Sequence, residues 1–392
     1  MHAQSQKVLI LLGIFVFIAS WSNFLRESLP PQQHEEPQAR DHSIYNRTLG
    51  FQEVFALALP DRLDRVQPLL KAANATNITV TVLDAVRDKQ ISKDAWPKGW
   101  AANREPKPGE LGCLISHVRT WKKIAHENIA SAIIMESDAD WDMRVKDIMT
   151  RVSDGARAIA DWPFNRTQEL TGRLPDYSSP YGDKWDIIWI GHCGSTPCGT
   201  GMCGDGRIYR VNDTAAPDSE HEYTFGSGPL DEQKRPGTRM TYQVRGGVCS
   251  TAYAISYSGA VKLIEGLKEN GDNIDLALGR LCNQRRDLSC VGVWPQVITA
   301  AASKSNIAHP DGEVAPGSAE DDQIHPGPAL QYSARVNAEK AIQGLGQEHW
   351  RAEWDGTWVL KNQEWTHISF EEAKAIEEVE QWEKMNETLS AR

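Results

Sequence analysis

The stretch that decides the fold is Ser131–Asp142, SAIIMESDADWD, in which a short apolar run leads directly into a cluster of acids. The apolar run is typical of a buried β-strand. Four acids then fall within seven residues: Glu136, Asp138, Asp140 and Asp142. Carboxylates this close repel one another at low dielectric, so a divalent cation or strong hydrogen bonds must offset the repulsion. The stretch therefore predicts a strand that ends in a cation-binding loop.

The segments on either side alternate between strand and helix patterns. Apolar and β-branched runs predict strands at 53–59, 78–83, 185–191 and 249–256, and amphipathic spacing predicts helices at 61–73, 110–128 and 258–268. This alternation indicates an α/β fold, a three-layer sandwich with a mostly parallel sheet. Ligands of such sheets bind at the carboxyl ends of the strands.

The tripeptide Asp138-Ala139-Asp140 is an Asp-x-Asp pattern, by which nucleotide-sugar transferases hold a metal against a diphosphate. Oxygen-only ligands favour Mn²⁺ or Mg²⁺ over zinc, so we predict Asp138 and Asp140 as metal ligands. The structural alternative is a solvated turn or a helix cap. Trp141, inside the acid cluster, is a candidate sugar contact.

Composition and charge narrow the classes of function. The chain has 392 residues, which allows one large domain with appendages or two domains. With 42 Lys and Arg against 53 Asp and Glu, the net charge is −11, which argues against nucleic-acid binding. Such an acidic protein needs a metal ion between its own carboxylates and an anionic substrate.

The N-terminal region predicts a membrane anchor. Residues 8–25 form an uncharged, mostly apolar run, so we expect a cytosolic tail at 1–7, a signal anchor at 8–25 and a stalk at 26–50. The alternative is a cleaved signal peptide with its apolar region at 8–19, which leaves a secreted protein. Six glycosylation sequons follow, at Asn46, Asn74, Asn77, Asn165, Asn212 and Asn386. Together these features predict a single-pass type II protein of the Golgi or endoplasmic reticulum, with its body in the lumen.

Cysteine usage agrees with an oxidising lumen. Six of the seven cysteines cluster, at positions 193, 198, 203, 249, 282 and 290, which suggests up to three disulfides without fixing their pairing. Cys113 stands apart as the candidate free, buried thiol. A zinc site formed by His192 and the cysteines at 193, 198 and 203 is the less favoured alternative, because the four-residue gaps match no common zinc motif.

Successive blocks of the chain resemble glycosyltransferase family 25, which is known for lipopolysaccharide and collagen galactosyltransferases. The blocks are Leu59–Arg65 (LPDRLDR), Gly109–Cys113 (GELGC) with Ser116-His117, Met135–Asp138 (MESD), Trp185-Asp186 with Trp189–Gly194 (WIGHCG), Ala252–Ser256 (AYAIS) with Gly259-Ala260, and Ile274–Ala277 (IDLA). They cover about residues 50–310, so we expect a catalytic domain at 51–310. A Pro/Gly/Asp-rich boundary at 308–328 then leads into a C-terminal extension at 311–392, with a charged helix at 370–389.

The resemblance implies a nucleotide-binding fold of the GT-A type, a UDP-sugar donor, most often galactose, Mn²⁺ dependence and inversion at the anomeric carbon. Carried over by position, Pro60, Arg62 and Asp64 lie near the nucleotide, and Asp138 and Asp140 hold the metal and the diphosphate. Arg65, near a helix N-terminus, and Glu136 complete the predicted nucleotide site.

The sequence departs from the family pattern at three places: Ala58 stands for Asn, Ser137 interrupts the usual Glu-Asp-Asp, and Ser305-Asn306 replaces an Asp-containing block. The change at Ser137 matters most because it removes a carboxylate beside the metal. It motivates an alternative function, a non-catalytic glycan-binding relative or a partner of another transferase. A glycoside hydrolase is disfavoured, because no Gly/aromatic-rich barrel pattern is present.

The general base is left open between Asp275 and Asp186, which both sit beside apolar segments. Their structural alternatives are a helix cap for Asp275 and a strand-end hydrogen-bond acceptor for Asp186. His192 follows a strand end and is a second candidate sugar contact, whereas His117 is favoured as a core histidine. Arg245-Gly246-Gly247 is favoured as a turn over an acceptor loop.

The sequence thus predicts an inverting, metal-dependent glycosyltransferase that uses Mn²⁺ (or Mg²⁺). Its expected partners are a UDP-sugar donor, a glycan or glycoprotein acceptor and, through the anchor, the membrane.

Overall fold

The structure is a computed structural model, and it describes residues 43–92, 96, 109–160, 179–198, 208–217, 235–267, 272–301, 330–361 and 364–369. The predicted anchor at 8–25 and the predicted helix at 370–389 lie outside the described residues. Within the described ranges no helix has the length and apolar character needed to cross a membrane.

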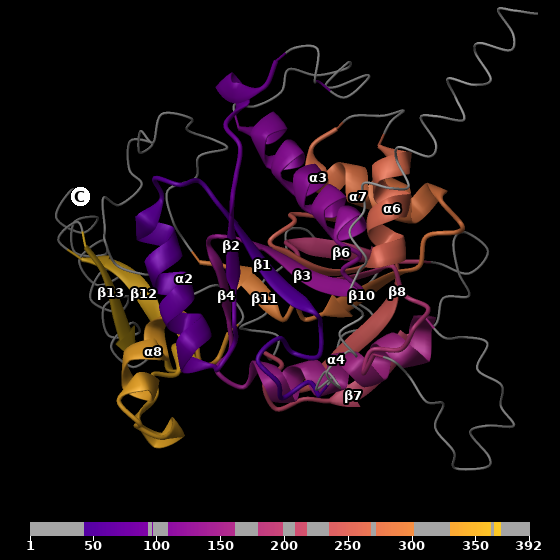
Figure 1. The fold of residues 1–392 in the computed structure, drawn as a ribbon. Helices are drawn as coiled ribbons and strands as arrows, with labels where there is room; N and C mark the ends of the chain where they lie inside the picture. The colour runs from indigo at the N-terminus through magenta and orange to yellow at the C-terminus, as the bar shows by residue number, and fades with distance from the viewer. Residues whose placement is uncertain are drawn as a thin grey trace, which may run out of the picture. The chain divides into compact units, whose positions relative to one another are not determined.

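A nine-stranded sheet organises the fold, in the order β2-β1-β3-β9-β5-β10-β8-β6, with β7 paired to β8 (Figure 1). The strands are β1 Glu53–Ala58, β2 Thr81–Asp84, β3 Ser131–Glu136, β5 Ile187–Gly191, β6 Gly194–Pro197, β7 Ile208–Asn212, β8 Thr238–Val248, β9 Ala252–Ser256 and β10 Cys290–Trp294. Strands β1, β2, β3, β5 and β10 share one direction, whereas β9 and β8 run antiparallel to their sheet neighbours. The sheet is therefore mixed and mostly parallel, which confirms the predicted α/β class.

Side-chain alternation in the strands divides the core into two apolar clusters. In β3, Ile133 and Met135 belong to one cluster, and Ala132 and Ile134 belong to the other. Successive side chains of a strand point to opposite faces, so a strand with apolar residues at every position must be covered on both sides. The run SAIIM in the sequence is therefore explained by burial on both faces.

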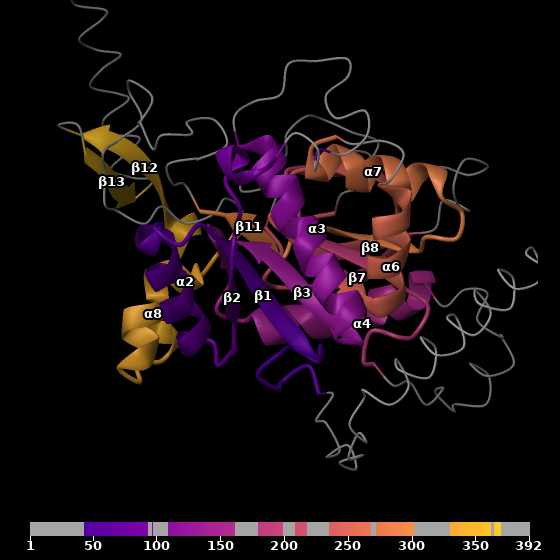
Figure 2. The ribbon, with the colours of Figure 1, turned by 45° about the horizontal axis from the view of Figure 1, so that its top comes forward.

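Helices cover both faces of the sheet (Figure 2). Helices α3 (Glu110–His126), α6 (Tyr257–Gly266) and α7 (Ile274–Gln284) contribute to one cluster, and α2 (Leu63–Ala75), α4 (Val145–Ala160) and α8 (Ala334–Ile342) contribute to the other. Both ribbon views place α2 and α8 side by side, and the two helices are in contact. This arrangement is the predicted three-layer sandwich.

Two small sheets and three 3₁₀ turns complete the described fold. Strand β4 (Ala139–Trp141) pairs with β11 (Ile298–Ala300), and β12 (Gly356–Lys361) pairs with β13 (Glu364–Ser369). The 3₁₀ turns are η1 (Asp88–Gln90), η4 (Gln347–His349) and η5 (Glu353–Asp355). The acid stretch therefore does not end in an open loop, because β4 follows β3 after two residues.

One segment differs from the sequence prediction, and another adds a contact that the sequence did not indicate. Arg245-Gly246-Gly247, favoured as a turn, lies inside β8, where Gly246 pairs with Thr196 of β6. The glycines concealed the strand because they carry no side chain that could show an apolar pattern. Helix α8, which falls in the predicted C-terminal extension, packs against α2 and β4 of the predicted catalytic domain. The N-terminal part of that extension, up to 329, lies outside the described residues.

Disulfides account for the clustered cysteines that the structure describes. Cys193 pairs with Cys249, Cys282 pairs with Cys290, and Cys198 is also disulfide-bonded. The alternative zinc site at 192–203 is therefore wrong for Cys193 and Cys198, because a disulfide sulfur has no thiolate to offer a metal. Cys113 is the free cysteine of the described residues, as the sequence predicted, although it is half-buried and not fully buried.

Candidate functional site

Strand β3 delivers the first acid to the carboxyl edge of the sheet. Glu136 is its last residue, and alternation places the side chain on the face that α3 covers, the same face as Ile134. The Ser250 hydroxyl, just before β9, donates to Glu136 Oε1 at 2.9 Å. The Glu136 backbone N–H donates to the Thr251 carbonyl at 2.9 Å, which fixes the end of the strand.

Burial and, second, the neighbouring charge of Asp138 raise the pKa of the Glu136 carboxyl to about 7. The Ser250 hydrogen bond and the positive charge of Arg65 act in the opposite direction, and Asp275 adds a smaller repulsion. Glu136, Asp138 and Asp275 thus form an acid group that Arg65 compensates only in part. Such a group favours an added cation.

Asp138 has a carboxylate oxygen that is free to bind a ligand. Its Oδ2 forms an ion pair with Arg65 Nη1 at 3.2 Å, and both side chains are largely buried. Its Oδ1 is buried without a hydrogen-bond partner. A buried carboxylate oxygen without a partner is costly, so the site suits a ligand that supplies positive charge. Oxygen donors from Glu136 and Asp138 match the preference of Mn²⁺ and Mg²⁺, and on this ground the residues fit the predicted cation.

Asp275 lies in the first turn of α7, close enough to Glu136 to repel its charge. Its Oδ2 accepts the Cys249 N–H at 2.8 Å, and its Oδ1 accepts the Leu276 N–H at 2.8 Å. The Cys193–Cys249 disulfide ties this backbone to the residue that follows His192. The structure therefore brings Asp275 to the acid group.

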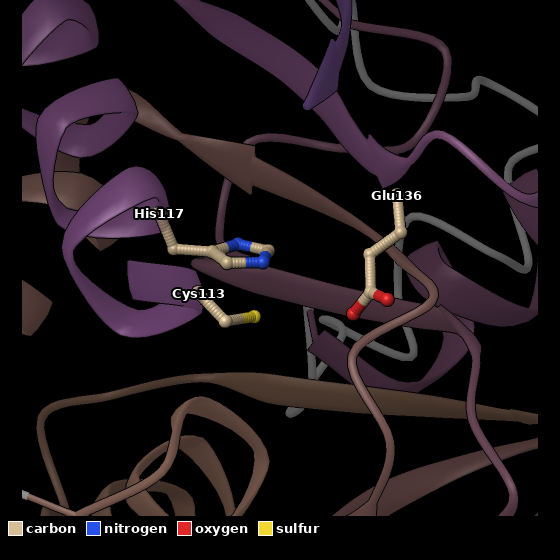
Figure 3. A group of neighbouring side chains, drawn as sticks. All are labelled: Cys113, His117 and Glu136. Atoms are coloured by element: carbon tan, nitrogen blue, oxygen red, sulfur yellow. The ribbon is translucent and has the colours of Figure 1, made fainter. Parts of the chain in front are cut away.

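Helix α3 adds two side chains to the same edge, Cys113 and His117 (Figure 3). One ligand atom each of Cys113, His117 and Glu136 lie within 4.8 Å of one another. Burial lowers the pKa of His117 to about 3, so the imidazole is neutral. Burial also raises the pKa of the Cys113 thiol, and the charges of Glu136 and Asp275 raise it further. Sequence reasoning left these residues out of the site, although their i, i+4 spacing on a predicted helix was the available signal.

Asp140 and Asp142 point away from this group and bind the N-terminal turn of α8. Asp140 Oδ2 accepts the Ser333 hydroxyl at 2.6 Å, and its Oδ1 accepts the Arg335 N–H at 3.2 Å. Asp142 pairs with Arg144 at 2.8 Å and accepts the Tyr332 N–H at 3.0 Å. The prediction that Asp138 and Asp140 share a metal is not realised here, because both Asp140 oxygens accept hydrogen bonds from the start of α8, whereas Asp138 pairs with Arg65. Asp140 instead fits the structural alternative, because it accepts hydrogen bonds at the N-terminal end of α8.

Asp186 lies at the opposite edge of the sheet, immediately before β5 begins. Lys262 Nζ and the Ser289 N–H donate to Asp186 Oδ2 at 2.6 and 2.8 Å, and Ser258 bonds to Oδ1. A parallel strand that starts at Asp186 ends at Gly191, so the two edges are separated by the length of the strand. Asp186 is therefore not near Glu136 and acts as the predicted strand-end acceptor.

Two predicted sugar contacts are core side chains. Trp141 is 1% exposed, belongs to the cluster that α2 and α4 cover, and donates its indole N–H to Thr76 Oγ1 at 3.1 Å. His192 is buried, stacks on Trp294, and bonds through Nε2 to the Val293 carbonyl at 2.9 Å. Neither ring has a face open to a ligand, which corrects the prediction for both.

The predicted nucleotide-binding residues lie at the start of α2, beside the acid group. Pro60 is exposed, and Arg62 occupies the N-cap position and donates to Asp64 at 2.7–3.1 Å. Arg65, one turn further on, reaches Asp138. The N-terminal turn of a helix offers free N–H groups and the positive end of the dipole, which suits an anion.

Comparison with known proteins identifies relatives for the region that holds the site. Residues 51–173 match the model of glycosyltransferase family 25 (LPS biosynthesis protein), which confirms the resemblance over that range. Similar curated proteins include procollagen galactosyltransferase 2 of Mus musculus, 27% identical over 129 residues, which are 30% of this chain and 21% of the relative. Procollagen galactosyltransferase 1-A of Xenopus laevis is 28% identical over 125 residues, 29% of this chain and 20% of the relative. The probable inactive glycosyltransferase 25 family member 3 of Bos taurus is 26% identical over 154 residues, 36% of this chain and 22% of the relative.

The matches span about a fifth of the length of these relatives. The range 51–173 contains α2, α3 and the strand that ends in Glu136, but not Ser250 or Asp275. The range that matches the family model therefore contains three residues that the structure brings together, Arg65, Glu136 and Asp138.

Proposed function

We propose, from the family 25 match over residues 51–173, that this chain transfers a sugar from a nucleotide-sugar donor to a hydroxyl of a glycan or glycoprotein. UDP-galactose is the proposed donor, because the relatives include proteins named galactosyltransferases. The proposed fold type is GT-A, and inversion at the anomeric carbon is the proposed stereochemical course.

One observation carries the proposal. A buried strand places Glu136 and Asp138 at the carboxyl edge of the sheet, where Asp138 pairs with Arg65 and keeps a buried oxygen without a partner. An acidic protein that binds a diphosphate needs a cation at that place. We therefore assign the metal to Glu136 and Asp138, in place of Asp138 and Asp140.

The proposed cation, Mn²⁺ (or Mg²⁺), supplies positive charge that stabilises the departing diphosphate. The protein's own part is to hold the donor. Arg65 and Arg62 offer guanidinium groups to phosphate or ribose oxygens at the N-terminus of α2, with Pro60 and Asp64 beside them. Because Asp138 anchors Arg65, the metal-binding and phosphate-binding sides of the site are linked.

Asp275 is the general base that we propose, since Asp186 lies at the other edge of the sheet. In an inverting transfer the base removes the proton of the acceptor hydroxyl while that oxygen attacks the anomeric carbon opposite the leaving diphosphate. The N–H groups of Cys249 and Leu276 hold the Asp275 carboxylate in place. A fixed carboxylate needs no reorganisation when the acceptor arrives.

The proposed setting is the lumen of the Golgi or endoplasmic reticulum. The apolar run at 8–25, the sequons and the disulfides support a type II anchor with a lumenal catalytic domain. Residues 51–310 remain the proposed catalytic domain, now with α8 of the C-terminal extension packed on it.

A donor screen tests the proposal. Purified chain is incubated with UDP-sugars and mixed acceptors, with and without Mn²⁺, and released UDP is measured. We expect UDP-galactose turnover that requires Mn²⁺ and falls at least about a hundredfold in Asp138→Asn, because electrostatic groups at a transferring centre contribute on that order. Asp154→Asn is the matched control, since Asp154 is an exposed acid on α4 that pairs with Arg157. Full activity in Asp138→Asn would remove the metal assignment.

A non-catalytic relative is the second candidate function. Ser137 stands between the two acids, and one relative carries the name probable inactive family member 3. No UDP release from any donor, together with binding of UDP-sugar to the unmodified chain, would favour this alternative.

A further inference from the structure

The side chains of Cys113, His117 and Glu136 converge on one point at the edge of the sheet. Figure 3 shows the thiol and the imidazole of α3 directed towards the carboxylate at the end of β3. Their ligand atoms lie within 4.8 Å of one another. The three groups supply sulfur, nitrogen and oxygen, a set that differs from the oxygen-only pair of Glu136 and Asp138.

The fold fixes this convergence at two levels. Cys113 and His117 are four residues apart on α3, so they lie on one face of the helix. That face packs on the sheet, because His117 Nδ1 is hydrogen-bonded to the Tyr253 hydroxyl of β9 at 2.8 Å. Tyr253 pairs in register with Ile134 of β3, two residues before Glu136.

The His117 ring is held as a metal-bound imidazole usually is. Tyr253 binds its Nδ1, and Trp121 Nε1 donates to the same phenol oxygen at 2.7 Å. Its Nε2 is buried without a hydrogen-bond partner, and the residue is 0% exposed. A second hydrogen bond at the far nitrogen that fixes the ring is the typical support of a metal-binding histidine. In the tautomer whose Nδ1–H donates to the Tyr253 hydroxyl, Nε2 carries no proton and can bind a metal.

The donor set selects the chemical class of the ion. Cysteine sulfur and histidine nitrogen favour Zn²⁺ over Mn²⁺ and Mg²⁺, which prefer oxygen. Tetrahedral zinc with ordinary bond lengths places its ligand atoms about 3.3–3.6 Å apart. Because 4.8 Å is the upper limit of the separations, the group must contract by at most about 1.5 Å. Glu136, partly buried and with three rotatable bonds, can provide that movement. Three protein ligands leave a fourth position for water.

We propose that Cys113, His117 and Glu136 form a zinc site that shares Glu136 with the acid pair, and that the Cys113 thiol releases its proton to solvent as zinc binds. The two sites are mutually exclusive, because zinc withdraws the Glu136 carboxylate from Asp138. Zinc therefore competes with any cation that binds to Glu136 and Asp138, and it inhibits the activity that depends on that cation. The binding itself does not depend on the proposed glycosyl transfer, whereas the inhibition does.

Metal binding to the full chain tests the site without any sugar substrate. Apo-protein is titrated with Co²⁺ and Zn²⁺ in metal-free, oxygen-free buffer, and Co²⁺ binding is followed by the thiolate-to-cobalt absorption band. We expect the band in the unmodified chain, its bleaching by Zn²⁺, and its loss in Cys113→Ser. We also expect zinc affinity to fall at least about tenfold in Cys113→Ser and in His117→Asn.

The matched control is His126→Gln, which removes an exposed histidine from the last turn of the same helix. It should keep both the band and the zinc affinity. The apo forms are first compared by thermal unfolding, and Cys113→Ser replaces a single atom. A second measurement uses the unmodified chain, in which Zn²⁺ should slow alkylation of Cys113 at least tenfold, as followed by mass spectrometry. A cobalt complex without the thiolate band, or unchanged alkylation, would refute the site.

Activity separates the two proposals. In a chain that transfers sugar with Mn²⁺, added Zn²⁺ should lower UDP release, excess Mn²⁺ should restore it, and Cys113→Ser should need at least tenfold more Zn²⁺. A chain that binds zinc as described but transfers no sugar refutes the proposed function and leaves the zinc site standing.

Discussion

At the residue scale, the acids of the decisive stretch have three different environments. Glu136 and Asp138 lie near Arg65, Asp140 binds the N-terminal turn of α8, and Asp142 pairs with Arg144. The spacing of the acids in the sequence showed that carboxylates cluster here. It could not show which of them share a partner and which do not. The partners of Asp140 come from residues 333 and 335, which no local pattern connects to it.

Asp138→Ala and Asp140→Ala form a matched pair that tests this division. Asp140→Ala leaves the buried Ser333 hydroxyl and Arg335 N–H without their acceptor, so we expect it to lower the free energy of unfolding by about 2 kcal/mol or more. Asp138→Ala leaves the largely buried Arg65 guanidinium without its ion-pair partner, but it also removes a carboxylate oxygen without a partner and the repulsion of Glu136, so we expect a smaller loss than for Asp140→Ala. Urea unfolding in metal-free buffer measures both values, and the reverse order would contradict the assignment.

His192 gives the fold a defined sensitivity to acid. Burial lowers its pKa to about 4, whereas a histidine in the unfolded chain titrates near 6.5. Between these values the unfolded chain takes up a proton that the folded chain does not, so the stabilisation is present above pH 6.5 and is lost as the pH falls towards 4.

Denaturant unfolding at pH 7 and pH 4.5 measures this effect. We expect the unmodified chain to lose about 2 kcal/mol more than His192→Gln between the two pH values. The glutamine amide can still donate to the Val293 carbonyl, and it does not titrate. His117 titrates in both proteins and cancels in the comparison. Equal losses in the two proteins would show that His192 is not the acid-sensitive group.

At the element scale, the start of α3 explains the block Gly109–Cys113. Gly109 has a φ of 85°, a conformation that favours glycine, and the Asp88 carboxylate accepts the N–H groups of Gly109 and Gly112. A Cβ on Gly112 would collide with the Val86 carbonyl oxygen. The two glycines therefore serve the close approach of α3 to residues 86–88, which positions Cys113 and His117.

Gly112→Ala tests this close approach. We expect it to lower the free energy of unfolding by about 1–3 kcal/mol, because rigid backbone must move to admit the methyl group. Gly246→Ala is the matched control, since a Cβ at Gly246 meets nothing within 4 Å. Thermal or urea unfolding measures both variants. An unchanged free energy of unfolding in Gly112→Ala would show that residues 86–88 move to make room for the methyl group.

The strength of the sequence prediction varied with how each element is buried. Strands β1 and β3, covered on both faces, have continuous apolar runs and were predicted close to their observed bounds. Strand β8 was missed, because its last residues alternate poorly and contain two glycines. The carboxyl-edge location of Glu136 followed from strand direction, whereas the role of Asp186 stayed open, because an acid beside an apolar segment is typical both of a general base and of a strand-end hydrogen-bond acceptor.

At the scale of the whole molecule, exposure of the sequons tests the proposed lumenal setting. Asn77 and Asn212 are exposed outside the helices, Asn74 is exposed within α2, and Asn46 is half-buried. Asn165 and Asn386 lie outside the described residues. We expect chain produced through a secretory pathway to carry N-glycans at Asn77 and Asn212. Peptide mapping after enzymatic deglycosylation locates them, with Asn77→Gln and Asn212→Gln as controls. Absence of glycan at both positions would argue against passage through the lumen.

The bonds from Asp140 to Ser333 and Arg335 span 193 and 195 residues of chain. During synthesis on a ribosome, Asp140 emerges long before Ser333 and Arg335, the residues that bind its carboxylate. A nascent chain that stalls before residue 333 can form strand β3 but leaves the Asp140 charge in water. Completion of the acid loop is therefore among the last steps of biogenesis, after nearly the whole polypeptide has been translated.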